Sequence, residues 1–403
     1  MNILFICCAY SQYKADSYRY HSKRGYQFAA QTFQSALISG FLSNSINVTV
    51  LSFPALSTYP FGYKRPFIRN CDFIFDDINL GKSLGFINLP FLKHPTQFQY
   101  GHLVTKWLDC NSKSDSAIIV YGFNKKLIDI AKYARKKRND IPIILIVPDL
   151  PEFLGCNAIY TRLGLQKNRI YKLYSSINLF DGFVLLTERM RDKMNFGNKP
   201  YVVIEGIYKD EELDQPDISS DQNSFKILYS GALDKRYGIC QLLEAFSSLN
   251  YADCQLLLCG NGDAVPVIIN YSNADGRIKY LGSLPVNKVR QLQKEASLLI
   301  NPRSSKEEFT KYSFPSKTME YMASGTPTLM SKLKCIPEEY YPYLLFFETD
   351  SISGIKDGIE RIYHMDKTER SRLGQKASFF IKQEKNAKKQ TSKVLYLLTK
   401  LTK

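Results

Sequence analysis

The sequence predicts an α/β protein of two domains, each built on a mainly parallel sheet. At 403 residues the chain is too long for one hydrophobic core and suits two domains of about 150–200 residues each. Short β-branched runs alternate with longer amphipathic stretches, as in parallel strands joined by helices. This alternation stops once, at a polar segment of residues 209–224, and then begins again. We therefore expect two Rossmann-like domains that face a cleft, with the ligand site at the carboxyl ends of their strands.

The first domain is expected to span residues 1–208. Its strands are the runs of Ile, Val and Leu at residues 3–8, 47–53, 117–121, 141–147, 183–186 and 201–204. Helices are expected at residues 25–42 and 125–137. The segments 53–75 and 84–100 mix Phe, Tyr, Leu and Pro with Lys and Arg, and we expect them to form ordered surface loops.

Residues 209–224 are expected to be a linker, because they are acidic, contain Ser and Pro and have few apolar side chains. The second domain, residues 225–375, repeats the alternation. Its expected strands are 227–230, 255–259, 278–280 and 298–301, and its expected helices are 238–248, 287–294 and 316–323. Residues 376–403 are expected to form a basic C-terminal helix that packs back on the first domain.

The composition is typical of a folded soluble protein, with 44% hydrophobic and 23% charged residues. No stretch approaches the roughly 18 apolar residues that span a bilayer, and the apolar residues 1–8 predict a buried strand rather than a signal peptide. Most of the nine cysteines lie in apolar runs, which favours reduced thiols in a cytoplasmic protein. No Cys or His group has the spacing of a zinc site, so we expect no metal.

The net charge of +16 is concentrated in residues 1–200, which contain 26 Lys and Arg against 13 Asp and Glu. Such an excess indicates an anionic partner, either nucleic acid or a membrane surface. No recognition helix or sheet with stacking aromatics is evident, so we expect no nucleic-acid partner. Aromatic side chains beside cations in 53–75 and 84–100 favour shallow contact with an anionic membrane, although ordinary surface loops have the same composition. We expect a peripheral protein on the inner face of the plasma membrane.

Residues 229–238 (YSGALDKRYG) comprise the end of an expected strand of the second domain, a glycine turn and a basic loop that opens a helix. Gly231 lets the backbone approach a ligand closely, because glycine has no Cβ. Lys235 or Arg236 can contact phosphate oxygens. The loop is neither a P-loop nor a GxGxxG dinucleotide fingerprint.

Further loops follow the other strands of this domain. Gly260 and Gly262 form a Gly-Asn-Gly turn, which is a weak signal by itself. The loop LGSLP contains Leu284, and the loop NPR ends at Arg303. Because the carboxyl ends of parallel strands meet at one edge of a sheet, these loops can converge on a single ligand.

Residues 313–327 (SFPSKTMEYMASGTP) hold the most informative motif, a Phe-Pro-Ser turn followed by a short helix that begins at Ser316. Helix N-termini attract anions because their first amide N–H groups are unpaired. Lys317 at this start indicates a phosphate contact, and Glu320 one turn later can accept hydrogen bonds from sugar hydroxyls. The alternative is an ordinary helix with Lys317 and Glu320 as an i, i+3 surface pair.

Taken in order, these motifs resemble the C-terminal half of the retaining GT-B glycosyltransferases of family 4, a group that includes bacterial polysaccharide and capsule enzymes. The resemblance is strong over residues 225–330, and it rests on YSGALDKRYGICQLLEAF, LLLCGNGD, RIKYLGSLP and NPRSSKEEFTKYSFPSKTMEYMASGTP. It is weaker over the first domain, in IPIILIVPDLPEF, FDGFVLLTERM and KPYVVIEGI. It implies the GT-B fold. It also implies donor-binding roles for Gly231, Lys235, Gly260, Gly262, Leu284, Arg303, Ser316 and Glu320.

The chain departs from the family pattern in three respects. Seven residues separate the family's two glutamates, which puts Tyr312 where the partner of Glu320 would stand. We expect either that Glu308 does the work of that glutamate or that Glu320 acts alone. The family's Gly-Arg and Lys-Gly pairs are replaced around Ala232 and Tyr237. The first domain also lacks a Gly-Gly turn after its first strand and a histidine after its fourth.

The expected mechanism uses no metal, because the chain has cationic loops but no DxD triplet. We expect Arg236, Lys317 and helix N-termini to stabilise the departing diphosphate, and Glu308 to contact the sugar. The resemblance implies same-face attack, in which the donor phosphate accepts the acceptor's proton. Asp149, after the fourth strand, is expected to bind the acceptor, and a turn-forming role at the strand end is equally consistent. No cofactor is expected besides the donor substrate.

The leading hypothesis is therefore a retaining glycosyltransferase that moves a sugar from a nucleotide diphosphate sugar to a lipid-linked saccharide in surface polysaccharide biosynthesis. A UDP-sugar is favoured over a GDP-sugar. One alternative is a catalytically lapsed GT-B partner protein, which the departures at Tyr312 and Ala232 motivate. Another is a GT-B UDP-sugar 2-epimerase, which would need no lipid acceptor. A basic nucleic-acid binder is the least favoured alternative.

Overall fold

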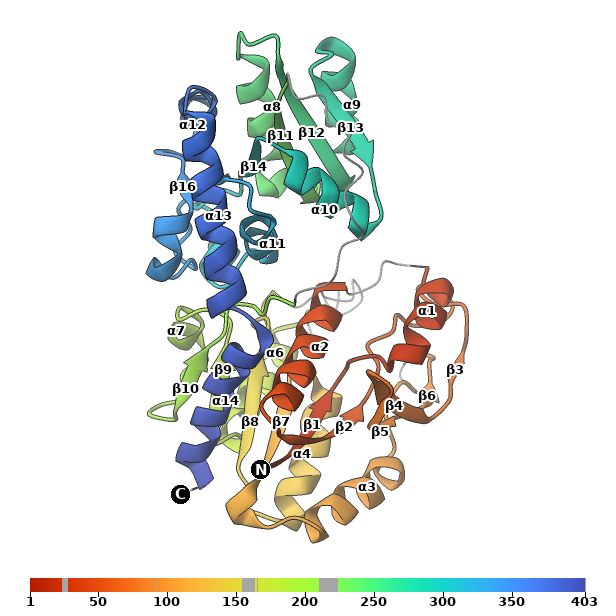
Figure 1. The fold of residues 1–403 in the computed structure, drawn as a ribbon. Coiled ribbons are helices and arrows are strands. Elements are labelled where there is room, and N and C mark those ends of the chain that lie inside the picture. Colours follow the sequence, from red (N-terminus) through yellow and green to blue (C-terminus); the bar gives the residue numbers. More distant parts are fainter. Residues whose placement is uncertain (24–27, 91, 154–163, 165, 210–223, 403) are drawn as a thin grey trace. The chain divides into compact units, whose positions relative to one another are not determined.

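The structure is a computed structural model, and it describes all residues except 24–27, 91, 154–163, 165, 210–223 and 403. The chain divides into two compact units (Figure 1). The first contains Met1–Ile207 together with Ala387–Lys403, and the second contains Tyr208–Asn386. The predicted linker, residues 209–224, falls almost entirely outside the described residues. Each unit is an α/β structure with a mainly parallel sheet, as the alternating sequence pattern predicts.

The sheet of the first unit has eight strands within the described residues, in the order β10-β9-β8-β7-β1-β2-β5-β4. The strands are β1 (Asn2–Cys7), β2 (Asn47–Ser52), β4 (Cys71–Phe75), β5 (Ile78–Ser83), β7 (Ser116–Tyr121), β8 (Ile143–Val147), β9 (Gly182–Leu185) and β10 (Tyr201–Val203). All neighbours pair in parallel except β4 with β5. The strand order changes direction between β1 and β7. In open α/β sheets, ligands bind beside the loops that follow the strands at such a switch point.

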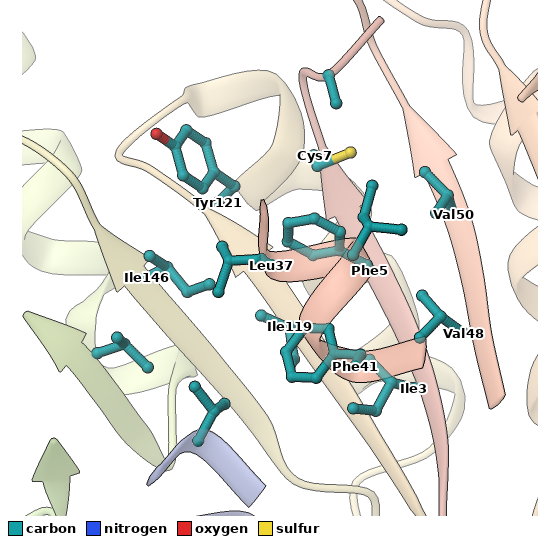
Figure 2. Packing of buried hydrophobic residues seen from close by; sticks show 14 of the residues in the cluster. Ile3, Phe5, Cys7, Leu37, Phe41, Val48, Val50, Ile119, Tyr121 and Ile146 are labelled. Atoms are coloured by element: carbon teal, nitrogen blue, oxygen red, sulfur yellow. The ribbon is translucent and has the colours of Figure 1, made fainter. Parts of the chain in front are cut away.

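The helices of this unit are α1 (Gln12–His21), α2 (Phe28–Ser43), α3 (Gln97–Asp109), α4 (Lys125–Lys137), α6 (Gln166–Tyr174), α7 (Met190–Met194) and α14 (Ala387–Thr402), with the 3-10 turns η1 (Lys113–Asp115) and η2 (Ser175–Leu179). The helices α2, α4 and α14 pack against strands of the sheet, and α3 packs against α4. Leu37 and Phe41 of α2 pack against Ile3 and Phe5 of β1 (Figure 2). All four side chains are fully buried, so the first strand forms the centre of this core.

The expectation that residues 53–75 and 84–100 are loops is wrong in part. They contain the short antiparallel pair β3 (Phe67–Ile68) and β6 (Phe86–Ile87), together with β4 and the start of α3. β4 and β5 form a hairpin whose two loop residues, Asp76 and Asp77, have φ of 46° and 61°. Two consecutive positive φ values are the geometry of a tight type I′ turn, which Asp tolerates. The strands were not predicted because these segments are rich in Pro and aromatic residues, which is typical of loops.

A single C-terminal helix over residues 376–403 was also a wrong expectation, because the chain turns between two helices. The helix α13 (Lys367–Glu384) belongs to the second unit, and α14 belongs to the first. At the turn, Lys385 is 1% exposed and its Nζ lies 2.6 Å from Glu339 Oε1. The carbonyl of Lys385 accepts a hydrogen bond from the N–H of Tyr208. Val394 and Leu398 of α14 lie in the core of the first unit.

The sheet of the second unit is parallel throughout its described residues, in the order β13-β12-β11-β14-β15-β16. Its strands are β11 (Phe225–Ala232), β12 (Cys254–Asn261), β13 (Ile278–Gly282), β14 (Leu298–Asn301), β15 (Thr328–Met330) and β16 (Leu345–Phe346). In chain order this is 3-2-1-4-5-6, the strand order of the Rossmann dinucleotide-binding fold. The switch point of this sheet lies between β11 and β14.

The helices of the second unit are α8 (Ile239–Ser247), α9 (Val265–Ala274), α10 (Val286–Glu295), α11 (Ser316–Ser324), α12 (Ile352–Tyr363) and α13, with the 3-10 turns η3 (Lys235–Tyr237), η4 (Glu308–Lys311) and η5 (Glu338–Tyr343). The helix α13 packs against α11 and η5. The helix α8 places its apolar face, including Leu242 and Phe246, against β11 and β12. None of the described helices in either unit has the length and apolarity that crossing a bilayer requires.

Candidate functional site

The two glycine loops of the second unit lie side by side at the carboxyl ends of β11 and β12. Gly231 pairs with Gly260 in the strand register, and Gly260 has a φ of +141°. A Cβ added at Gly260 would overlap the carbonyl oxygen of Gly231, and one at Gly262 would overlap the backbone of Leu233. The backbone N–H of Lys235 donates to Asp263 Oδ1 over 2.8 Å. These positions therefore need glycine so that the two loops can approach closely.

Two guanidinium groups share two aromatic rings at the switch point, in a cluster of Arg236, Tyr237, Arg303 and Phe309. The Arg303 Cζ lies 4.5 Å from the ring centroid of Tyr237 and 5.5 Å from that of Phe309. The Arg236 Cζ lies 5.0 Å and 5.7 Å from the same rings. Stacking on aromatic faces is a favourable setting for the planar guanidinium group. The loops after β11 and β14 therefore contact each other through the stacking of both arginines on the same two rings.

Arg303 is the more deeply placed of the two arginines. Burial lowers its pKa, and its Nε–H is buried without a hydrogen-bond partner among the described residues. Arg236 is largely exposed and pairs with Asp234 at 3.3 Å. A buried N–H that finds no protein acceptor is costly, and a bound anion would satisfy it. Arg303 is therefore well suited to bind a phosphate group.

The helix α11 begins next to the glycine loops. Pro315 is its N-cap residue and makes no side-chain cap, so the first amides of the helix lack a capping side chain. Ser316, the first residue, is exposed. A Cβ at Gly231 would lie 3.7 Å from Lys317 Cγ, so the start of α11 adjoins the end of β11. The start of α11 is therefore positioned to bind an anion beside the glycine loops.

Lys317 and Glu320 contact each other in this structure. The Lys317 Nζ donates to Glu320 Oε2 over 2.6 Å, and each side chain is about two fifths exposed, at 38% and 41%. Both the surface-pair interpretation and the ligand-site interpretation are compatible with this geometry. The pair is at the rim of the glycine loops, where a ligand can separate its two charges.

A buried hydrogen-bond network beneath the site fixes α11 to β11. The Tyr321 hydroxyl accepts from the N–H of Ser230 over 2.7 Å and donates to the Ser230 carbonyl over 3.0 Å. Gln293 Nε2 donates to Ser230 Oγ, and Thr326 Oγ1 donates to the Gln293 carbonyl. Since Tyr321 follows Glu320, this network sets the position of Glu320 and Lys317 relative to Gly231. This network was not predicted from the sequence, because a tyrosine in an apolar stripe does not indicate a polar role.

Leu284 and Glu308 lie on two other loops of this edge. Leu284 packs against the apolar cluster that contains Cys259 and Tyr321. Glu308 is exposed and begins η4, and the next residue, Phe309, stacks on both arginines of the cluster. The loops after β13 and β14 are therefore present at the same edge as the glycine loops.

Asp149 lies in the first unit, at the carboxyl end of β8. Part of its side chain reaches solvent, but the surrounding protein atoms desolvate the carboxylate and raise its pKa to about 6. Tyr121, at the end of the neighbouring strand β7, interacts electrostatically with it and has a raised pKa caused mainly by its own burial. A carboxyl group with a perturbed pKa at a strand end is a candidate functional group.

The structure thus assembles the predicted donor residues at one edge of one sheet, and Asp149 at the matching edge of the other sheet. The aromatic partners Tyr237 and Phe309 were not predicted as site residues. Tyr237 could have been found, since it directly follows the basic loop. The described residues contain no group of three or more His, Cys, Asp or Glu side chains that could hold a metal ion.

Comparisons with known proteins bear on both units. Residues 210–378, somewhat less than half of the chain, match the family described as Glycosyl transferases group 1. No curated protein matches the chain in sequence. The matched residues include all of the loops of the second unit described above.

Several solved structures resemble the whole chain. Sucrose-phosphate synthase from Thermosynechococcus elongatus is 15% identical with a TM-score of 0.63, over 100% of this chain and 99% of that one. HepE from Anabaena, in complex with UDP and glucose, is 14% identical with a TM-score of 0.60, over 99% and 100% of the two chains. The lipopolysaccharide outer core galactosyltransferase WaaB is 16% identical with a TM-score of 0.61, over 98% and 99%.

At these identities the likeness shows the fold. The chain has the GT-B fold of two Rossmann-like domains, its second unit matches the group 1 glycosyl transferases, and together these findings support a glycosyltransferase.

Proposed function

We propose that this protein is a retaining glycosyltransferase of the family 4 type, which moves a sugar from a UDP-sugar to a lipid-linked saccharide in the synthesis of a surface polysaccharide such as capsule. The observation that carries the proposal is that Gly231 and Arg303 lie at the carboxyl ends of β11 and β14, the strands on either side of the switch point, and that Lys317 adjoins Gly231. Glycine lets the backbone approach the nucleotide closely, and the guanidinium of Arg303 and the ammonium of Lys317 can bind its phosphates. The HepE structure that contains UDP and glucose supports UDP as the nucleotide.

The donor diphosphate would lie against the start of α11 and the arginine cluster. Arg236, Arg303 and Lys317 would stabilise the negative charge that develops on the leaving diphosphate, without a metal ion. Glu320 would accept hydrogen bonds from the ribose hydroxyls, which frees Lys317 for phosphate. Glu308 would contact the sugar. In same-face attack the donor phosphate accepts the proton of the acceptor hydroxyl, so no protein base is required.

The acceptor would bind to the first unit, at the edge that holds Asp149. With a pKa raised to about 6, this carboxyl group is mostly ionised at neutral pH and can accept a hydrogen bond from an acceptor hydroxyl. This proposed role is supported by the position of Asp149, which lies at the end of β8, next to the switch point of the first sheet.

We propose a peripheral location on the inner face of the plasma membrane. The first unit exposes several large apolar side chains, among them Phe61, Phe67 and Phe98, which are 75%, 65% and 93% exposed. Lys64 and Arg65 lie between the first two in sequence. Apolar side chains beside cations are suited to shallow insertion among anionic headgroups.

The direct test is a donor screen with purified protein, radiolabelled UDP- and GDP-sugars, and membranes that supply the acceptor. We expect transfer of label from one UDP-sugar to a lipid-extractable product. UDP binding without any transfer would indicate the lapsed-partner alternative, and conversion of UDP-GlcNAc without acceptor would indicate the epimerase. No UDP binding at all would reject both the glycosyltransferase and the epimerase.

A further inference from the structure

The first sheet has its own switch point, between β1 and β7, and two lysines lie beside it. Lys126 is the second residue of α4, the helix that follows β7. Lys93 lies in the loop between β6 and α3. Neither residue belongs to the donor site of the second unit, and the proposed function assigns a role to neither.

The two lysines share one aromatic platform. The Lys126 Nζ lies 4.9 Å from the ring centroid of Phe53, and the Lys93 Nζ lies 5.5 Å from that of Phe86. The two rings are both buried, and their centroids are 4.5 Å apart. The Lys93 Nζ also donates a hydrogen bond to the carbonyl oxygen of Leu56. The ammonium groups are therefore held in place by packing rather than extended freely into solvent.

No carboxylate of the described residues forms an ion pair with either ammonium group. The adjacent Lys125 is paired, since its Nζ lies 2.6 Å from Asp129 Oδ2. Burial lowers the pKa of Lys93 to about 7, with repulsion from Lys126 adding to the effect, and burial lowers the pKa of Lys126 to about 8. Burial and the charge of Lys126 also lower the pKa of His94. Neither ammonium group has a carboxylate partner that offsets the cost of its burial, and a bound anion would supply one.

Exposed apolar side chains adjoin these cations along the chain. Leu92 precedes Lys93 and is 58% exposed, and Phe98, at the start of α3, is almost fully exposed. Asp149 follows β8, the strand next to β7 at the same edge of the sheet. The first unit therefore holds exposed apolar side chains, two ammonium groups without a carboxylate partner, and a carboxyl group suited to a sugar hydroxyl. A molecule with a lipid chain, a phosphate and a sugar has the complementary groups.

We propose that Lys93 and Lys126 bind the phosphate group of the acceptor, and that this acceptor is a lipid phosphate or diphosphate. The inference rests on the proposed function, because it concerns the acceptor of that transfer, and it names the chemistry of the acceptor more closely. A free phosphate anion would satisfy the same two ammonium groups, so the test separates these two sources.

The test is calorimetric titration of the full chain with farnesyl diphosphate, a soluble isoprenoid diphosphate, in the presence of saturating UDP. UDP occupies the donor site, so that the second titration reports on the first unit. We expect binding to the wild-type protein, at least tenfold weaker binding to Lys93→Gln/Lys126→Gln, and retained binding to Lys93→Arg/Lys126→Arg. Inorganic diphosphate and farnesol, which each lack one part of the probe, should both bind at least tenfold more weakly than farnesyl diphosphate.

Lys125→Gln is the matched control, because it removes a neighbouring lysine that is already paired, and we expect less than a twofold change. Equal binding by the wild type and the double Gln variant would overturn the proposal, as would an equal loss in Lys125→Gln. If inorganic diphosphate bound as tightly as farnesyl diphosphate, the lipid assignment would be wrong. A separate UDP titration should give the same affinity for wild type and variants. Its failure in the wild type would count against the proposed function and not against this site.

Discussion

The Nζ of Lys317 and the Oε2 of Glu320 are 2.6 Å apart near the start of α11, so the two charged groups of the most informative motif neutralise each other. An exposed i, i+3 pair stabilises a helix by only about 0.2–0.5 kcal/mol. A nucleotide that offers phosphate to the lysine and ribose hydroxyls to the glutamate can therefore separate the pair at little cost.

This relationship predicts that Lys317→Met weakens UDP binding about tenfold, which corresponds to about 1.4 kcal/mol, because a charge-assisted phosphate contact is lost. The stability of the fold should change by less than about 0.5 kcal/mol. Lys356→Met is the control, since Lys356 forms a similar exposed pair with Glu360 on α12, outside the site. Calorimetric titration with UDP and chemical denaturation measure the two effects. Wild-type UDP affinity in Lys317→Met would show that the pair is structural.

A second prediction concerns Arg303. The substitution Arg303→Lys keeps the positive charge but loses the planar group that stacks on Tyr237 and Phe309, so UDP affinity should fall about tenfold. Arg277 provides a comparison, because it stacks on Phe246 and pairs with Asp275 away from the site. Arg277→Lys should lower the melting temperature and leave UDP affinity unchanged. Similar UDP affinity in wild type and Arg303→Lys would contradict a role for Arg303 in the site.

The third prediction tests the close approach of the two glycine loops. In Gly260→Ala the new methyl group would overlap the carbonyl oxygen of Gly231 at a φ of +141°, so we expect a loss of about 3 kcal/mol or more in the free energy of unfolding. Gly276→Ala should be close to neutral, since a Cβ there meets no atom within 4 Å. Urea denaturation of both variants measures the difference. Equal stability would mean that the loops can separate freely.

The fourth prediction follows from the raised pKa of Asp149. The folded chain holds a proton on this carboxyl group up to about pH 6, whereas the unfolded chain releases it near pH 4. The contribution of Asp149 to stability therefore falls as the pH rises from about 4 to 6, and it remains low above that range. Asp149→Asn should be more stable than the wild type at pH 7.5, and this gain should disappear near pH 4. Melting curves at the two pH values test this.

Asp129→Asn is the control for Asp149, because it removes a carboxylate from an exposed ion pair with Lys125 and should give no gain in stability at pH 7.5. If Asp149→Asn melted at the wild-type temperature at both pH values, the desolvation of Asp149 would be refuted.

Much of the fold could be predicted from the sequence because parallel strands buried on both faces are continuous apolar runs. The expected helix at 125–137 coincides with α4, and the expected strand at 298–301 coincides with β14. The hairpin of β4 and β5 was missed, since its turn of two aspartates lacks the usual glycine signal. The turn at Lys385 was missed because nothing in a run of basic residues indicates that one lysine is buried against Glu339.

The position of the candidate site could be predicted from the sequence, because its loops follow the strands of one sheet. Gly231, Gly260 and Lys317 are brought together by strand register and by the docking of α11 on β11. The contacts that depend on side-chain packing could not be derived, such as the stacking of Arg303 on Phe309. The resemblance to family 4 puts Tyr312 at the position of a second glutamate, and the role of Glu308 in its place remains a prediction.

The most direct measurement of the central claim is calorimetric titration of the full chain with UDP, with GDP as the comparison, followed by assay of UDP release from UDP-sugars in the presence of membranes. The proposed donor site predicts a single UDP site per chain, weaker binding of GDP, and release of UDP that depends on the membranes. A chain that binds neither nucleotide, while its melting curve shows that it is folded, would contradict the claim.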